Sequence, residues 1–220
     1  MATFPWDQLE HRKLACVCCS GDLSSLESAK ALAERCELLI AADGGAEHLF
    51  EMGLKPDLIV GDGDSLKRDY WPEGEVIERV SLPCEKDCSD GEYAVGLALD
   101  RGMEKIVMIG AMGGRLDHSL GQVSILLRYS TSLMLWDGRF FVRALKSGDR
   151  VDFSPKRASI VSILPLSEEC SISNDGMKYG LSGESLLYST HALSNLAVKS
   201  RCSIELHRGT ALLCIEEHQA

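Results

Sequence analysis

The first part of the chain alternates between short apolar runs and longer segments that mix apolar and polar residues. The apolar runs stop at glycine, aspartate or other turn-forming residues, so they predict buried strands. They lie at residues 14–19, 38–42, 58–60, 106–109 and 133–136. A run with alternating apolar residues at 76–80 predicts one more strand.

The segments between these runs predict helices. We expect them from Ser24 or Ser25 to about Arg35, at 46–52, from Ser89 to Gly102, and at 117–129. Ser89 and Glu92 have the spacing of a capping box, in which each side chain satisfies a free backbone N–H of the first turn. Residues 67–74 are expected to form a loop or a short helix. Strands that alternate with helices favour a parallel sheet covered by helices.

The pattern changes near residues 136–140. From Gly138 onward, short β-branched runs are separated by turn sequences such as Ser-Gly-Asp, Asn-Asp-Gly and Arg-Gly-Thr. Turns at intervals of about 8 to 12 residues are typical of antiparallel β structure. We therefore expect an α/β domain over residues 1–137 and an antiparallel β domain over residues 138–220.

Acidic residues gather where the second and third predicted strands end. Asp43 follows the second strand, and Asp62 and Asp64 follow the third. Open α/β sheets bind ligands at the carboxyl ends of their strands, so these aspartates are expected to face one crevice. Two carboxylates about 4 Å apart repel by roughly 4 kcal/mol at an effective dielectric of about 20, so a cation should accompany them.

The nature of these side chains indicates which cation. Oxygen donors without nearby Cys or His suit Mg²⁺, which proteins usually hold with one or two carboxylates and the phosphates of a substrate. The sequence therefore predicts a metal–phosphate site. The alternative is that these Asp and Gly residues only form turns, as they often do.

A second polar group precedes and begins the predicted helix at residue 89. Lys86 could neutralise a phosphate, and Asp87 and Asp90 are three residues apart. Carboxylates are favoured at helix N-termini, so Asp90 could serve only as a helix-capping residue.

A third polar group follows the predicted strand at 106–109. Gly113 and Gly114 allow backbone N–H groups to approach an anion at the start of the next helix. Arg115 can bind two phosphate oxygens at once, and Asp117 and His118 follow it. His118 alone could also be a structural histidine.

Two common nucleotide-binding motifs are missing from the sequence. There is no G-x-x-x-x-G-K-[ST], and no G-x-G-x-x-G follows the first predicted strand, which argues against a P-loop enzyme and a dinucleotide-binding fingerprint. Phosphoryl transfer would then depend on Mg²⁺ bound by aspartates, on Lys86, on Arg115 and on backbone amides.

Composition restricts the remaining classes of function. The chain has 220 residues, 45% of them hydrophobic, and a net charge of −10, which disfavours a nucleic-acid-binding role because phosphate contacts come from Lys and Arg. It has no run of 18 apolar residues and no N-terminal pattern of a signal peptide, so we expect a cytoplasmic protein without a membrane span. The nine cysteines are then expected to be free thiols, and the Cys16–Cys19 pair is not expected to bind zinc.

Taken together, the polar groups resemble the motifs of the thiamine pyrophosphokinase family in both order and spacing. They are Asp43-Gly44-Gly45-Ala46, the stretch from Lys55 to Ser65, the stretch from Lys86 to Asp90 with Glu92, and the stretch from Gly113 to His118. The β-rich tail also has counterparts in that family, at residues 176–181, at Ser194-Asn195 and at residues 209–215. The resemblance covers most of residues 14–215.

This resemblance implies a fold, a reaction and partners. The fold is an α/β nucleotide-binding domain followed by a C-terminal antiparallel β-sandwich. The reaction transfers the pyrophosphoryl group of ATP to the hydroxyethyl oxygen of thiamine, with Mg²⁺, to give thiamine diphosphate and AMP. The resemblance also implies a homodimer in which thiamine binds where the subunits meet.

The resemblance further assigns roles to individual residues. Candidates for Mg²⁺ and diphosphate binding, which are also catalytic candidates, are Asp43, Asp62, Asp64 and Asp90, joined in catalysis by Arg115. Candidates for positioning ATP are Lys86, Asp87, Ser89, Arg115, Asp117 and His118. Candidates for binding the thiamine ring are Ser194 and Asn195. Either Asp64 or Asp90 could orient or deprotonate the thiamine hydroxyl.

The chain departs from the family pattern at several positions. Gly63 stands where the family usually has Phe, Ser89 where it has Thr, and Gly180 where it has Pro, and residues 188–193 match only loosely. Two other hypotheses therefore stay open. One is a related pyrophosphokinase that acts on another alcohol, and the other is a non-catalytic protein that binds the nucleotide or thiamine.

Overall fold

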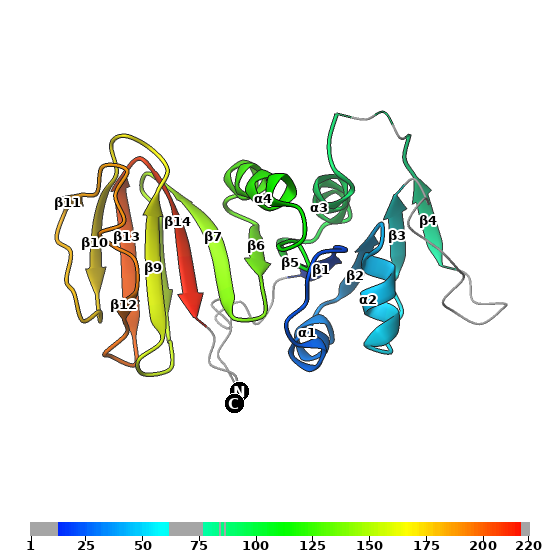
Figure 1. The fold of residues 1–220 in the computed structure, drawn as a ribbon, viewed down its shortest axis with the longest axis horizontal. Helices are drawn as coiled ribbons and strands as arrows, with labels where there is room; N and C mark the ends of the chain where they lie inside the picture. The colour runs from blue at the N-terminus through cyan, green and yellow to red at the C-terminus, as the bar shows by residue number, and fades with distance from the viewer. Residues whose placement is uncertain (1–12, 62–76, 84, 86, 217–220) are drawn as a thin grey trace. The chain divides into compact units, whose positions relative to one another are not determined.

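The protein is described by a computed structural model at residues 13–61, 77–83, 85 and 87–216. Within these residues the chain forms two compact units, one that ends at Gly138 and one that begins at Arg139 (Figure 1). No helix in the described ranges is both long and apolar enough to cross a membrane.

The first unit contains a parallel sheet with the strand order β6-β5-β1-β2-β3-β4. The strands are β1 (Leu14–Cys18), β2 (Leu38–Ala42), β3 (Leu58–Gly61), β4 (Glu78–Ser81), β5 (Lys105–Ile109) and β6 (Leu133–Trp136). Most residues of β1, β5 and β6 are fully buried, because helices cover both faces of the sheet. Such burial explains why these strands are uninterrupted apolar runs in the sequence.

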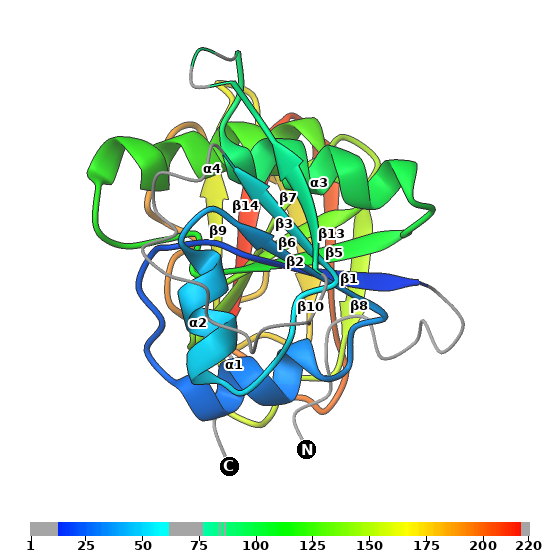
Figure 2. The same ribbon diagram turned by 90° about the vertical axis from the view of Figure 1, so that its right-hand side faces the viewer.

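Four helices cover this sheet. They are α1 (Leu26–Ala33), α2 (Gly45–Glu51), α3 (Asp90–Asp100) and α4 (Leu116–Arg128). Figure 2 shows α1 and α2 on one face of the sheet and α3 and α4 on the other. Two of the helices begin at serine caps, since Ser25 accepts a hydrogen bond from Ser28 N and Ser89 accepts one from Glu92 N, each at 3.2 Å. The serine caps explain where α1 and α3 start.

The order of the strands changes direction at β1 in the first unit. The chain moves outward from β1 through β2, β3 and β4 on one side, and through β5 to β6 on the other. The helices that follow β1 and β5, α1 and α4, therefore lie on opposite faces of the sheet, and ligands bind at such a point in open α/β sheets.

The second unit is an antiparallel β-sandwich. One sheet has the order β12-β9-β14-β7 and the other β11-β10-β13-β8. The strands are β7 (Phe140–Lys146), β8 (Arg150–Phe153), β9 (Ile160–Pro165), β10 (Ser171–Asp175), β11 (Glu184–Ser185), β12 (Asn195–Leu196), β13 (Cys202–Arg208) and β14 (Thr210–Glu216). Leu145 and Leu213 from the first sheet share one apolar core with Ile172, Ile204 and Leu206 from the second. The α/β and β-sandwich classes expected from the sequence and the family resemblance are therefore confirmed.

Candidate functional site

Glycines bring the loops at the carboxyl edge of the parallel sheet into close contact. Gly21 N donates to Gly110 O at 2.6 Å, and a Cβ on Gly21 would lie only 2.5 Å from that oxygen. A Cβ on Gly45 would lie 1.9 Å from Cys18 O, so the start of α2 packs directly on the end of β1. Side chains at these two glycines would force the loops apart, which is why small residues occur there.

Asp43 stands at the end of β2 in a left-handed conformation, with φ 49°. Its N–H donates to Val60 O at 2.7 Å, and a Cβ on Gly61 would lie 3.3 Å from its Cα. Asp43 is therefore adjacent to the end of β3, from which the chain continues directly into Asp62. Asp62, Asp64 and Lys86 lie outside the described residues.

Asp90 is the first residue of α3 and lies close to the end of β1. The next residue, Gly91, packs against Cys19, because a Cβ on Gly91 would lie 3.2 Å from Cys19 Sγ. Burial, and then the negative charge of Asp90, raise the pKa of the Cys19 thiol to about 12. Asp43 and Asp90 thus approach the same sheet edge, and one carboxylate oxygen of each, Oδ1, is buried. Asp87, three residues earlier, is exposed.

These side chains are suitable ligands for a hard cation. In the described part of the chain, no three His, Cys, Asp or Glu side chains come close enough together to hold a metal ion. Asp43 and Asp90 nevertheless offer only oxygen donors, and one or two carboxylates are what Mg²⁺ needs when substrate phosphates supply further ligands. The residues present therefore fit Mg²⁺.

Arg115 and Asp117 form a two-pronged ion pair at the start of α4. Arg115 Nε lies 3.1 Å from Asp117 Oδ1 and Nη2 lies 2.6 Å from Oδ2, while His118 N donates to Oδ1 at 3.0 Å. The hydrogen bonds from Arg115 lower the pKa of Asp117 to about 2. The carboxylate therefore stays charged and holds the exposed guanidinium in one orientation.

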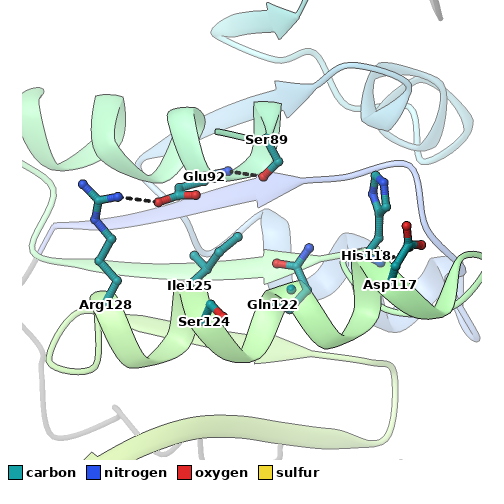
Figure 3. A pocket seen from close by; sticks show the side chains of 9 residues that line it. Ser89, Glu92, Asp117, His118, Gln122, Ser124, Ile125 and Arg128 are labelled. Carbon is teal, nitrogen blue, oxygen red and sulfur yellow. Dashed lines mark hydrogen bonds and ion pairs between the residues drawn. The ribbon is translucent and has the colours of Figure 1, made fainter. Parts of the chain in front are cut away.

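A groove of about 480 Å³ lies between α3 and α4 (Figure 3). Ser89 and His118 line the end where both helices begin, and an ion pair between Arg128 Nη1 and Glu92 Oε1, 2.7 Å long, lies farther along it. The structure thus brings three predicted ATP-positioning residues, Ser89, Asp117 and His118, to one groove. Helix N-termini attract anions, so this end suits phosphate.

The groove also contains residues that the sequence analysis did not select. They are Gln122, Ser124, Ile125 and Arg128 on α4, together with Glu92, which was expected as a helix cap and as part of a family motif but not as a site residue. Asp22 lies outside the predicted motifs as well, although its carboxylate lies against Gly113, where a Cβ would be 2.3 Å from Oδ2. The amphipathic pattern of α4 could have identified Gln122 as a polar residue on a buried face.

Ser194 and Asn195 belong to the second unit. The Asn195 side chain is buried and makes three hydrogen bonds, accepting from Tyr179 N and Leu196 N and donating to Tyr179 O. Ser194 is exposed, has φ 56°, and donates its N–H to Ser162 Oγ. Asn195 thereby attaches the loop that precedes β11 to strand β12. This structural role is compatible with positioning a ligand nearby.

Comparisons with known proteins give a consistent result. Residues 29–136 match a family model described as "Thiamin pyrophosphokinase, catalytic domain". The chain is 27% identical over 186 residues to thiamine pyrophosphokinase of Bacillus subtilis (strain 168), which covers 80% of this chain and 86% of the relative. It is 25% identical over 182 residues to thiamin pyrophosphokinase 1 of Caenorhabditis elegans, covering 74% of this chain and 73% of the relative.

Solved structures share the fold. The crystal structure of thiamine pyrophosphokinase from Bacillus subtilis superposes with a TM-score of 0.82 at 23% identity and covers 94% of this chain and all of its own. That of the thiamin pyrophosphokinase from Candida albicans has a TM-score of 0.80 at 18% identity, with 97% of this chain and 92% of its own covered. Both likenesses extend over the parallel sheet and the β-sandwich.

Proposed function

This chain belongs to the thiamine pyrophosphokinase family, and from that premise we propose that it transfers the pyrophosphoryl group of ATP to the hydroxyethyl oxygen of thiamine. The products are thiamine diphosphate and AMP. The main structural support is the convergence of Asp43 and Asp90 on one sheet edge, beside the start of α4, where Arg115 is held by Asp117.

The described residues can perform the binding steps of this reaction. Backbone N–H groups at the start of α3 and α4 would bind the triphosphate, and Arg115 would offer it N–H donors from a guanidinium that Asp117 orients. Charge stabilisation and positioning of this kind carry most of the catalysis in phosphoryl transfer. Bound Mg²⁺, held by Asp43 and Asp90 together with Asp62 and Asp64, would supply neutralisation of phosphate charge. Asp90 or Asp64 would orient the thiamine hydroxyl or accept its proton.

The remaining assignments are part of the same proposal. Residues 1–137 would bind ATP and Mg²⁺, with Lys86, Asp87, Ser89, Asp117 and His118 positioning the nucleotide. Residues 138–220 would bind thiamine near Ser194 and Asn195 and form a homodimer with active sites at the subunit interface. The protein would act in the cytoplasm. If the homodimer forms, light scattering should report twice the mass of one chain.

A product assay tests the proposed reaction. Incubation with ATP, Mg²⁺ and thiamine should yield AMP and thiamine diphosphate in equal amounts. Formation of AMP only with a different alcohol would identify a pyrophosphokinase with another acceptor. Nucleotide binding without turnover for any acceptor would identify a non-catalytic binding protein.

A matched pair of variants tests the role of the carboxylates. Asp90→Asn removes a charge at the start of α3 and should lower turnover by about 100-fold or more, the scale of losing one strong electrostatic contact in a transition state. Asp100→Asn removes a charge at the exposed other end of the same helix and should leave turnover near normal. Near-normal turnover of the Asp90 variant would remove this residue from the mechanism.

A further inference from the structure

Gln122 is a buried polar residue whose side-chain carbonyl accepts no hydrogen bond in the described part of the structure. It lies on α4, is only 8% exposed, and its Oε1 atom is fully shielded from solvent. Buried side-chain acceptors are nearly always paired in native proteins, because an unpaired acceptor has lost its bonds to water without replacement. This acceptor therefore has no donor among the described residues, and a bound ligand is one source of such a donor.

The position of Gln122 shows where that donor would come from. Its side chain points from α4 into the groove beneath α3 (Figure 3). The groove volume of about 480 Å³ is in the range of small-molecule sites. Gly121 also lines it, and a Cβ built on Gly121 would meet no atom within 4 Å, so a flat group has room to lie over the helix backbone.

The residues that line the groove differ in polarity along its length. Its mouth, at Ser89 and His118, lies where α3 and α4 begin and suits phosphate. Farther in, Ile125 provides an apolar surface, and the Glu92–Arg128 ion pair lies beyond. A ligand with phosphates at one end and a planar, hydrogen-bonding ring at the other matches this order. Gln122 lies where that ring would be.

We propose that Gln122 determines base specificity by pairing with the adenine of ATP. This inference rests on the proposed function, which makes ATP the pyrophosphoryl donor. The Gln amide can accept a hydrogen bond from the adenine N6 amino group and donate one to the adjacent ring nitrogen, the pairing by which Gln recognises adenine elsewhere. A rotation of the Gln122 amide towards the groove would expose Oε1 to adenine, which would then satisfy it.

Replacing Gln122 with Leu or with Glu should change the affinities for ATP and GTP in different ways. Gln122→Leu keeps the size of the side chain and removes both hydrogen bonds, so ATP affinity should fall roughly tenfold while inorganic triphosphate binds as before. Gln122→Glu places an acceptor-only group in the groove. Guanine presents two N–H donors to such a group and adenine only one, so the ratio of ATP to GTP affinity should fall by about tenfold or more.

The experiment is isothermal titration of the full-length wild type and variants with MgATP, MgGTP and inorganic triphosphate. Leu120→Ala, on the exposed side of the same helix, is the matched control and should change none of the affinities. Thermal melting gives an independent readout, because Gln122→Leu removes an unpaired buried acceptor and should raise the melting temperature of the nucleotide-free protein. Circular dichroism confirms that each variant is folded.

The outcomes separate this inference from the proposed reaction. Gln122-dependent ATP binding without formation of thiamine diphosphate would support the inference and overturn the reaction. Formation of thiamine diphosphate by the wild type, with unchanged ATP to triphosphate and ATP to GTP ratios in both Gln122 variants, would overturn the inference and leave the reaction standing. A wild type that binds no nucleotide would overturn both.

Discussion

The Arg115–Asp117 pair shows how one short contact fixes the charge of a site residue. Hydrogen bonds from the guanidinium lower the pKa of Asp117 to about 2 from an ordinary value of 3.8. A carboxyl whose pKa is lower in the folded state contributes stability above its ordinary pKa and loses that contribution as the pH falls through the folded value. The pair should therefore remain intact at every pH above about 4.

Removing Arg115 should reverse the lowering of the Asp117 pKa. In Arg115→Ala, we expect the pKa of Asp117 to rise from about 2 towards 3.8, because the charged donor that favours the carboxylate is gone. A carboxyl-carbon NMR titration measures this directly. Arg150→Ala is a useful control, since it releases a similar exposed pair with Asp152 in the other unit and should leave Asp117 unchanged. A pKa that stays near 2 without Arg115 would show that another group holds it there.

At the scale of elements, the starts of α3 and α4 carry two functions at once. Ser89 caps α3 and lines the groove, whereas Ser25 caps α1 without lining it. The two serines therefore make the same kind of hydrogen bond, at the same 3.2 Å, in different surroundings. Comparing variants of the two serines can therefore distinguish an effect on helix stability from an effect on ligand binding.

Replacing each serine with alanine should destabilise the protein by about 1 kcal/mol, the usual cost of losing an N-cap. Only Ser89→Ala should also weaken binding of MgATP. Chemical denaturation measures the first effect and titration with MgATP the second. Equal nucleotide affinities in the two variants would mean that Ser89 acts only as a cap.

In the β-sandwich, Asn195 connects two elements through its side-chain amide. Asn195→Ala removes three hydrogen bonds, two of them to the Tyr179 backbone, and should lower the free energy of unfolding by about 1 to 3 kcal/mol. Denaturant titration measures this loss. Ser194→Ala truncates the exposed neighbour and should have little effect on stability. If both variants unfold at the same denaturant concentration as the wild type, the amide does not stabilise the loop.

At the scale of the whole molecule, each of the two units is built around an apolar core. The parallel sheet buries its strands between helices, and the sandwich buries one cluster between two sheets. The described residues include no group of three or more metal-binding side chains. Because the apolar cores hold these units together, stability should be largely independent of the Mg²⁺ in the proposed reaction.

Chelation tests this separation. Adding EDTA should abolish formation of thiamine diphosphate, because the phosphate charge is no longer neutralised, and Mg²⁺ should restore it. The circular dichroism spectrum should not change, and the melting temperature should shift by no more than a few degrees. Cooperative unfolding on chelation would instead identify a structural metal.

The sequence determined the elements whose signal is local. β1, β2, β3, β5 and β6 begin and end within about one residue of the expected positions, because strands buried on both faces are continuous apolar runs. α4 was expected at 117–129 and occurs at Leu116–Arg128. The strand expected at 76–80 is β4, Glu78–Ser81, a polar strand at the edge of the sheet with a weaker pattern. The succession of Asp and Gly motifs also depends on local sequence, so it could be identified directly.

The tertiary structure decided which residues meet across elements. The groove exists because α3 and α4 pack side by side, and its Glu92–Arg128 pair joins residues 36 positions apart. The pattern of α4 can place Gln122 on a buried face, but only the packing of α4 beside α3 puts its amide in the groove. The Asn195 amide likewise acquires its partners only when the loop at Tyr179 folds back onto β12. Periodicity along a chain records which face of an element is buried, but the partner on that face is set by packing between distant segments.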